Sequence, residues 1–205
     1  MLAEKTLKKF LEETASKAPV PGGGSIAAMS GATAYALTEM VANLTIGKKG
    51  YEEVSEEMCK ISDSVSKLRE ELLYDIDRDA ASFDDVMKAF KMPKETDKEK
   101  QIRKEAIQKG YKKAALVPLE VSEKILGSME LIIKAVECGN KNAVTDAIVA
   151  VMMARTAILS ALFNVKINIG SIKDEKFVEE IKKKIASIEN SAIEFEKKVF
   201  NGVEL

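Results

Sequence analysis

Three consecutive glycines, Gly22, Gly23 and Gly24, stand immediately before Ser25 at a predicted helix start. Backbone N–H groups at a helix N-terminus attract anions, and glycines let a ligand approach the backbone closely. The turn is therefore a candidate binding site. The alternative is a structural turn in which Ser25 caps the helix. A P-loop is excluded, because no Gly-Lys-Ser/Thr follows at the required spacing.

Two aspartates stand where the helical pattern predicts burial or close packing. Asp79 follows Ile76 by three residues and precedes Phe83 by four, so it occupies a seam that is otherwise apolar. Asp146 lies in the first turn of an apolar segment, where the helix dipole alone would explain it. A lone buried carboxylate is costly unless it is paired or takes up a proton. Asp79 and Asp146 are therefore the candidate catalytic residues.

Other polar residues are candidates for binding. Lys48 and Lys49 share a predicted turn with Tyr51 and would suit an anionic ligand, although most such lysines are simply solvated. Asn43 stands in a helix of small residues, where a polar amide needs a partner. Asn164 belongs to a polar stripe along a later apolar segment, at steps of three or four. These residues complete the candidate binding set.

The composition excludes several classes of chemistry. The 205 residues contain no histidine, which removes Ser-His-Asp triads and histidine-ligated zinc. The net charge of -1 argues against general nucleic-acid binding. The two cysteines, Cys59 and Cys138, lie far apart and indicate a reducing compartment. No signal peptide is evident, and charges interrupt every long apolar stretch, so we expect a cytoplasmic protein that does not bind membranes.

Apolar residues recur at intervals of three and four along the chain, which contains only four prolines. This pattern predicts an all-α fold, a multi-helical antiparallel bundle with long helices, as a single domain over residues 1–205. Pro118 is expected to kink or divide the fourth helix. The expected helices cover about residues 2–17, 25–47, 54–90, 97 onward, 129–137, 142–164 and 174–200.

Three packing expectations follow from this pattern. The seam of helix 54–90 should continue through Phe83, Met87 and Phe90. Helix 142–164 is apolar nearly all round, which predicts the buried centre of the bundle. Arg155 points away from the polar stripe of that helix, and we expect it to pair across a subunit contact or with a glutamate of the last helix.

The chain resembles the formiminotransferase-cyclodeaminase C-terminal family in five segments, which follow in the same order and span most of its length. Each segment is weak alone, but the combination is specific. No counterpart of the formiminotransferase domain is recognised, so the resemblance is to the stand-alone members. The segments are PVPGGGS (Pro19–Ser25), MVANLTIGKKGY (Met40–Tyr51), DAASF (Asp79–Phe83), VPLEVSE (Val117–Glu123) and GNKNAVTDAIVA…NVKINIGSIKD (Gly139–Asp174).

This resemblance implies a cyclodeaminase-like helical bundle that forms a homodimer and acts on a tetrahydrofolate derivative. The implied reaction is either formiminotetrahydrofolate cyclodeamination or methenyltetrahydrofolate hydrolysis, and no metal is expected. Both reactions need a carboxylate beside the cationic N5–C–N10 bridge and a group that moves a proton. The glutamate tail of folate, including polyglutamylated forms, would suit Lys48, Lys49 and the start of the helix after Gly24.

Two other classes of protein compete with this interpretation. A non-catalytic helical scaffold or oligomerisation module explains the apolar seams equally well, but it explains neither the three glycines nor a buried Asp79. A carboxylate-bridged metal protein is the third possibility, and it lacks the Glu-x-x-His motif that such bundles use. The sequence does not separate the deaminase from the hydrolase, because both pass through the same methenyl intermediate.

Overall fold

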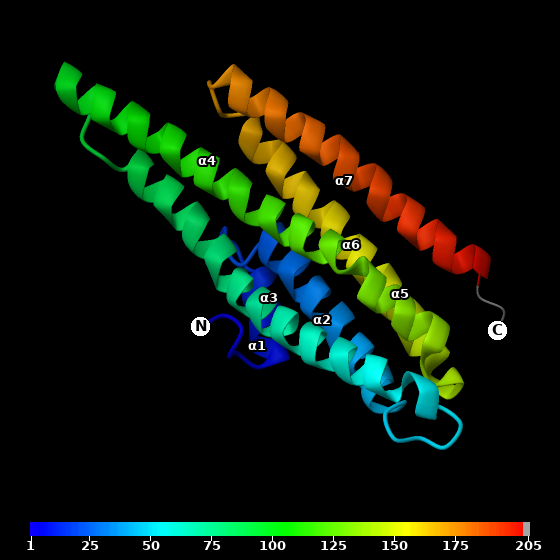
Figure 1. Cartoon of the computed structure of the whole chain (residues 1–205). Helices are drawn as coiled ribbons and strands as arrows, with labels where there is room; N and C mark the ends of the chain where they lie inside the picture. The colour runs from blue at the N-terminus through cyan, green and yellow to red at the C-terminus, as the bar shows by residue number, and fades with distance from the viewer. Residues whose placement is uncertain (203–205) are drawn as a thin grey trace.

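The computed structural model describes residues 1–202, and all regular structure in that range is helical (Figure 1). The prediction of an all-α antiparallel bundle is therefore confirmed. The helices are α1 (Leu7–Thr14), α2 (Gly23–Asn43), η1 (Glu52–Val54), α3 (Ser55–Phe90), α4 (Asp97–Gly127), α5 (Met129–Cys138), η2 (Lys141–Ala143), α6 (Val144–Ile169) and α7 (Glu175–Gly202), where η denotes a short 3₁₀ helix.

Three predicted boundaries are wrong by several residues. The first helix is much shorter than residues 2–17, and it buries Phe10 while leaving Leu7 and Leu11 exposed. The second helix ends at Asn43 rather than near residue 47. The sixth helix continues five residues beyond Asn164, so that Asn168 also lies in it.

Four of the five long helices, α2, α3, α4 and α6, surround one apolar core, to which α7 adds side chains from outside. Consecutive long helices run in opposite directions, α5 prolongs α4, and α7 lies along α6 (Figure 1). Helices α2 and α6 are neighbours and antiparallel. As a result, the start of α2, the end of α6 and the C-terminal half of α3 lie at one level of the bundle.

Small residues allow α2 to lie close to its neighbours. Its alanines at positions 27, 28, 34 and 42 are fully buried. A Cβ added to Gly31 would lie 2.6 Å from Cδ1 of Ile125 and 2.8 Å from Cδ1 of Leu72. Gly31 therefore lets the backbone of α2 contact side chains of both α3 and α4, which a larger residue would prevent.

The seam of α3 departs from the prediction in its last turns. Met87 and Phe90 are exposed, and the buried positions there are Val86 and Ala89 instead. The cause lies in α4, where a Cβ on Gly110 would lie only 3.2 Å from Cγ2 of Val86. The backbone of α4 thus covers the Val86 side of the helix, and the predicted continuation of the seam beyond Phe83 is wrong.

Pro118 does not divide α4, which continues through it to Gly127. A proline removes one backbone hydrogen bond and leaves the carbonyl four residues earlier without its donor. Here that carbonyl belongs to Ala114, and the side-chain amide Nδ2 of Asn168 donates to it at 3.0 Å. A side chain from α6 therefore replaces the bond that Pro118 removes.

Helix α6 is buried on one side only, so the prediction that it forms a fully buried centre is wrong. Its inner face includes Ala150, Ala154 and Ile158, none of them exposed, whereas Phe163 and Ile167 are 64% and 74% exposed. By length and composition, residues 141–169 could also cross a membrane, contrary to the expectation from their charges, and 44% of the most apolar stretch is buried in the bundle.

Arg155 leaves α6 on the side of the last helix. Its Nε lies 2.9 Å from Oε2 of Glu196 in α7, and Glu196 is largely buried. This contact confirms the second of the two partners expected for Arg155, a glutamate of the final helix, within a single chain.

Candidate active site

Asp79 lies on α3 opposite the first turn of α2. The hydroxyl of Ser25 donates to Oδ2 of Asp79 at 3.0 Å and lies 3.1 Å from the carbonyl oxygen of Ile76. Ser25 is fully buried, and Asp79 is partly buried. Within residues 1–202, no lysine or arginine forms an ion pair with Asp79. The carboxylate is thus held by a neutral donor and has no cationic partner in the described chain.

The glycines of the turn allow this close approach. A Cβ on Gly24 would lie 2.5 Å from Cγ and 2.7 Å from Oδ2 of Asp79. A Cβ on Gly23 would lie 3.2 Å from Nδ2 of Asn164, at the end of α6. The predicted candidates Gly23, Gly24, Ser25, Asp79 and Asn164 therefore lie together, where three helices meet.

The alternative role of Ser25 as a helix cap does not apply. Helix α2 begins at Gly23 with Gly22 as its cap residue, and no side chain caps it. The first N–H groups of a helix have no partner within the helix, and they stabilise a nearby negative charge. A carboxylate or an anionic ligand is therefore favoured beside this helix start.

A cavity of about 370 Å³ opens beside these residues. Apolar and aromatic side chains form part of its wall, and the backbone of the glycine turn and polar side chains of α3, of α6 and of the residues just after α6 complete it. Such a mixture suits a flat, partly polar ligand held by a few oriented groups. The lining residues are Pro19, Val20, Gly22, Gly23, Gly24, Asp79, Ser82, Phe83, Tyr111, Ala114, Asn164, Ile167, Asn168 and Ser171.

Burial raises the pKa of Asp79 above the ordinary value for an aspartate. Hydrogen bonds from the hydroxyl and the backbone N–H of Ser25 act in the opposite direction, but they do not cancel the desolvation. A carboxyl group with a raised pKa takes up and releases protons closer to neutral pH, which is the property of a general acid or base.

The lysine turn lies at the other end of α2. Lys48 donates from Nζ to Oδ1 of Asn140 at 2.7 Å and lies 5.6 Å from the ring centroid of Tyr51. The hydroxyl of Tyr51 accepts from the backbone N–H of Lys141 at 3.0 Å, and Lys49 is exposed. The turn is therefore fixed to the segment just before α6 and is not part of the cavity.

Asn43 and Asp146 lie at this same end. Oδ1 of Asn43 accepts from the hydroxyl of Ser62 at 3.0 Å, and Asp146 lies in the first turn of α6. At 1.5 Å per residue, Asn43 is about 30 Å from Gly23 along α2, and Asp146 is about 27 Å from Asn164 along α6. Within one chain, the candidate residues predicted from the sequence therefore lie in two groups, one at the cavity and one at the lysine turn.

Sequence reasoning missed the most deeply buried carboxylate. Asp75, one turn before Asp79, is only 1% exposed. It accepts from Nη1 of Arg78 and from Nζ of Lys124, both at 2.7 Å. Asp75 is fully paired and joins α3 to α4, whereas Asp79 is unpaired and faces the cavity. Of the two neighbours, Asp79 is therefore the one available to a ligand.

Other cavity residues were also not selected from the sequence. Tyr111 and Ser171 gave no signal, because nothing in their local pattern relates them to the glycine turn. Asn168 stands four residues after Asn164, a spacing that places both amides on one side of α6. That spacing was the signal which could have identified Asn168.

No group of three His, Cys, Asp or Glu side chains within residues 1–202 is close enough to hold a metal ion. The expectation of a reaction without metal remains a prediction. The described residues thus place one carboxylate without a cationic partner beside a helix start and at the wall of a cavity.

Comparison with known proteins agrees with the resemblance of the five segments. The profile of the formiminotransferase-cyclodeaminase family matches residues 6–187, and the chain belongs to this family. The methenyltetrahydrofolate cyclohydrolase of Methylorubrum extorquens is 38% identical over 207 aligned positions, which cover 100% of this chain and 98% of that protein.

Two further relatives carry the other activity in their names. The formimidoyltransferase-cyclodeaminase of Sus scrofa is 32% identical over 91% of this chain, but the chain corresponds to only 35% of that protein. The crystal structure of formiminotetrahydrofolate cyclodeaminase from Thermotoga maritima matches with a TM-score of 0.87 and 32% identity, over 97% of this chain and 96% of that one.

Proposed function

We propose that this protein is an enzyme that opens or closes the N5–C–N10 bridge of a tetrahydrofolate one-carbon derivative at the Asp79 cavity. The observation that carries the proposal is an unpaired, partly buried carboxylate at a cavity with aromatic walls. The methenyl bridge is a cation, and the pterin ring is flat and partly polar. A ligand of this kind supplies the positive charge that no lysine or arginine within residues 1–202 places beside Asp79.

The hydrolytic direction follows from the chemistry of this carboxylate. Asp79 accepts a proton from water while the water oxygen attacks the bridge carbon and gives a neutral tetrahedral adduct. The carboxyl group then protonates N5 as the bond between N5 and the bridge carbon breaks, and the hydroxyl proton of the adduct passes to water as the carbonyl forms, which leaves 10-formyltetrahydrofolate. The attack and the bond cleavage both require proton transfer, and general acid–base help is typically worth ~10²–10⁴ in rate.

The deaminating direction uses the same groups. N10 attacks the formimino carbon, and the N10 proton passes to the formimino nitrogen, which gives a cyclic aminal with an amino group. Asp79, in its protonated form, donates to the amino group, and ammonia leaves as the methenyl cation forms beside the resulting carboxylate. The raised pKa of Asp79 favours this protonated form. After the proton transfer, the negative charge of the Asp79 carboxylate stabilises the cationic methenyl product.

The proposal is tested by incubating the purified protein separately with 5,10-methenyltetrahydrofolate and with 5-formiminotetrahydrofolate. Products are separated by chromatography, and ammonia is measured in parallel. Formation of 10-formyltetrahydrofolate identifies the hydrolase, and release of ammonia with formation of the methenyl compound identifies the deaminase. Since the methenyl bridge also hydrolyses without an enzyme, reactions without protein are the control. No acceleration of either reaction would contradict the proposal.

We further propose that the protein is a homodimer. The outer sides of α2 and α6 form one apolar surface, called here the α2/α6 face, whose large exposed members are Met40, Leu44, Val149, Met152, Phe163 and Ile167. Monomeric proteins rarely expose an apolar patch of this extent. Sedimentation at micromolar concentration tests the proposal, and a monomer under those conditions would contradict it.

A further inference from the structure

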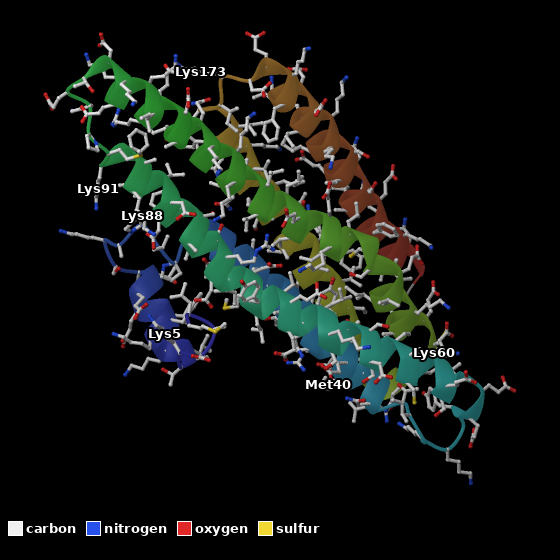
Figure 2. The ribbon with its side chains drawn as sticks, turned by 60° about the vertical axis from the view of Figure 1, so that its left-hand side comes forward. Lys5, Met40, Lys60, Lys88, Lys91 and Lys173 are labelled. Carbon is white, nitrogen blue, oxygen red and sulfur yellow. The ribbon has the colours of Figure 1, made fainter. Side chains whose placement is uncertain are left out.

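Two asparagines of α6 belong to the wall of the cavity. Asn164 and Asn168 are four residues apart, so their side chains leave α6 on the same side, and both line the cavity. Figure 2 shows Lys88 of α3 and Lys173, which follows α6, toward one end of the bundle, and Met40 of α2 toward the other. The end of α6 and the last turns of α3 therefore meet at the end of the bundle that holds the cavity.

Backbone carbonyl groups fix how the two side-chain amides point. Nδ2 of Asn164 donates to the carbonyl oxygen of Ser160 at 2.9 Å. Nδ2 of Asn168 donates to the carbonyl oxygens of Asn164 at 2.8 Å and of Ala114 at 3.0 Å. Turning either amide over would place its oxygen against a carbonyl oxygen, where no hydrogen is available to share. The NH₂ groups are therefore bound to the backbone, and the oxygens Oδ1 point the other way.

The two side-chain oxygens receive no hydrogen bond from the described chain. Within residues 1–202, no donor reaches Oδ1 of Asn164 or Oδ1 of Asn168. Neither oxygen is among the fully buried atoms that lack a hydrogen-bond partner, so solvent reaches both of them. An amide oxygen in this state accepts hydrogen bonds from a ligand. The α6 wall thus presents two free acceptors to whatever fills the cavity.

Aromatic side chains from the neighbouring helices line the same cavity. Phe83 comes from α3 and Tyr111 from α4, and the ring of Tyr111 meets that of Phe90 edge to face, with the centroids 6.2 Å apart and the planes at 83°. Rings of this kind pack against the face of a flat ligand. A flat ligand whose face lies on these rings has its edge left for the polar groups of α6.

The spacing of the two acceptors suits a single planar amino group. Two hydrogen bonds of about 2.9 Å from one such group place their acceptors about 5 Å apart. Side chains four residues apart on a helix have their Cβ atoms about 5–6 Å apart, which is nearly the same spacing. A ring N–H has only one hydrogen to donate and would leave one of the two oxygens without a partner.

We infer that the 2-amino group of the pterin binds between Oδ1 of Asn164 and Oδ1 of Asn168, and that these two residues determine specificity for an amino-substituted ring. This inference rests on the proposed function, which places the one-carbon bridge at Asp79. The bridge joins N5 and N10, whereas the 2-amino group stands on the pyrimidine ring, at the other end of the fused pair. A Cβ on Gly24 would meet Asp79, and one on the preceding Gly23 would meet Asn164, so a single fused ring reaches both groups.

A double-mutant cycle in equilibrium binding tests the inference. The wild type and Asn164→Ala are each titrated with tetrahydrofolate and with its 2-desamino-2-methyl analogue, which lacks the amino donor. Asn164 is chosen because its amide donates only within α6, whereas Asn168 also holds α4. We expect each single change to weaken binding by about 5–10-fold, and both changes together to weaken it by much less than the product of the two losses.

Two further variants separate this contact from a general effect on the fold. Asn190→Ala is the matched control, because Asn190 is an exposed asparagine within α7 that does not line this cavity, and it should bind both ligands like the wild type. Gly23→Ala would bring a Cβ within 3.3 Å of Oδ1 of Asn164, which displaces the oxygen without removing it. Gly23→Ala should weaken binding of tetrahydrofolate in the wild type but not in the Asn164→Ala background.

The outcomes separate the two proposals. Losses that multiply in the cycle would overturn the inference, and so would an analogue that binds the wild type as tightly as tetrahydrofolate does. Turnover of the methenyl or formimino compound by the same wild-type protein would leave the proposed function intact in either case. A cycle that shows the expected coupling, in a protein that converts neither compound, would instead overturn the proposed reaction and retain the contact with the amino group.

Discussion

Replacement of Gly24 by alanine tests whether the contact between α2 and Asp79 is needed for the reaction. The new Cβ would lie 2.5 Å from Cγ of Asp79, whereas non-bonded carbon atoms prefer about 3.5–4.0 Å. Because the carboxyl group ends a flexible side chain while Gly24 belongs to a packed helix, the carboxyl group must move by about 1 Å.

That movement has a cost which can be worked out from the geometry. The bond from the Ser25 hydroxyl to Asp79 is 3.0 Å long, and a displacement of this size breaks it. A hydrogen bond to a charged group contributes about 1.5–3 kcal/mol. A misplacement of about 1 Å at a reacting group costs on the order of 10²-fold in rate. We expect Gly24→Ala to lose about that much turnover in the assay of methenyl- or formiminotetrahydrofolate conversion.

Stability distinguishes this effect from simple unfolding. Alanine is favoured over glycine inside a helix by about 1 kcal/mol, which offsets part of the lost hydrogen bond. The net loss of stability should therefore be about 0.5–2 kcal/mol, which leaves the protein folded in the assay while turnover falls. Gly127→Ala is the matched control, because a Cβ there meets nothing within 4 Å, and it should keep wild-type turnover. A fully active Gly24→Ala enzyme would refute the reasoning.

Three further predictions concern stability. In the folded protein the pKa of Asp79 is raised above that of an ordinary aspartate. The wild type should therefore lose stability relative to Asp79→Asn as the pH rises from the ordinary aspartate pKa through this raised pKa. Thermal unfolding of both proteins across this pH range measures the effect, and a stability difference that does not change with pH would contradict it. Asp75→Asn should destabilise the fold by about 1–3 kcal/mol, because Arg78 and Lys124 would then lack the negative charge of their buried partner. An unchanged denaturant midpoint would count against this ion-pair network. Asn168→Ala should lower the free energy of unfolding by about 1 kcal/mol, because it removes the donor to the carbonyl of Ala114. In a Pro118→Ala background the loss should be smaller, since the backbone N–H of an alanine at 118 can donate to that carbonyl. Equal losses in the two backgrounds would exclude this role of Asn168.

Sequence patterns were sufficient for the bundle and for half of the candidate site. The three-and-four spacing of apolar residues predicted the long helices, because that spacing follows directly from helical geometry. The structure places the glycine turn against Asp79, where the missing side chain of Gly24 makes room for the carboxyl group. The run of three glycines and the aspartate in an apolar seam were local signals, and each could be recognised from its own stretch of sequence.

The distance between the candidates at the glycine turn and those at the lysine turn could also have been predicted from the sequence. The helix predicted after Gly24 already spans about 35 Å, so Lys48 and Lys49 lie at its far end in any straight helix. What the sequence could not supply is contact between distant segments. Arg78 and Lys124 pair with Asp75 rather than with Asp79, and Asn168 replaces a bond lost at Pro118, only because of how α3, α4 and α6 pack.

The central claim is that the carboxyl group of Asp79 moves a proton and faces a cation during conversion of the folate bridge. The most direct measurement compares the turnover of Asp79→Asn, and its equilibrium affinity for the product folate, with those of the wild type. The sedimentation and unfolding of the variant must first be shown to match those of the wild type. Asparagine keeps the shape of the side chain and removes its charge and its acidity. We predict a loss of at least ~10²-fold in turnover with the fold retained. Full activity, together with a gain in stability, would show that Asp79 is only a structural residue and that the reaction occurs elsewhere.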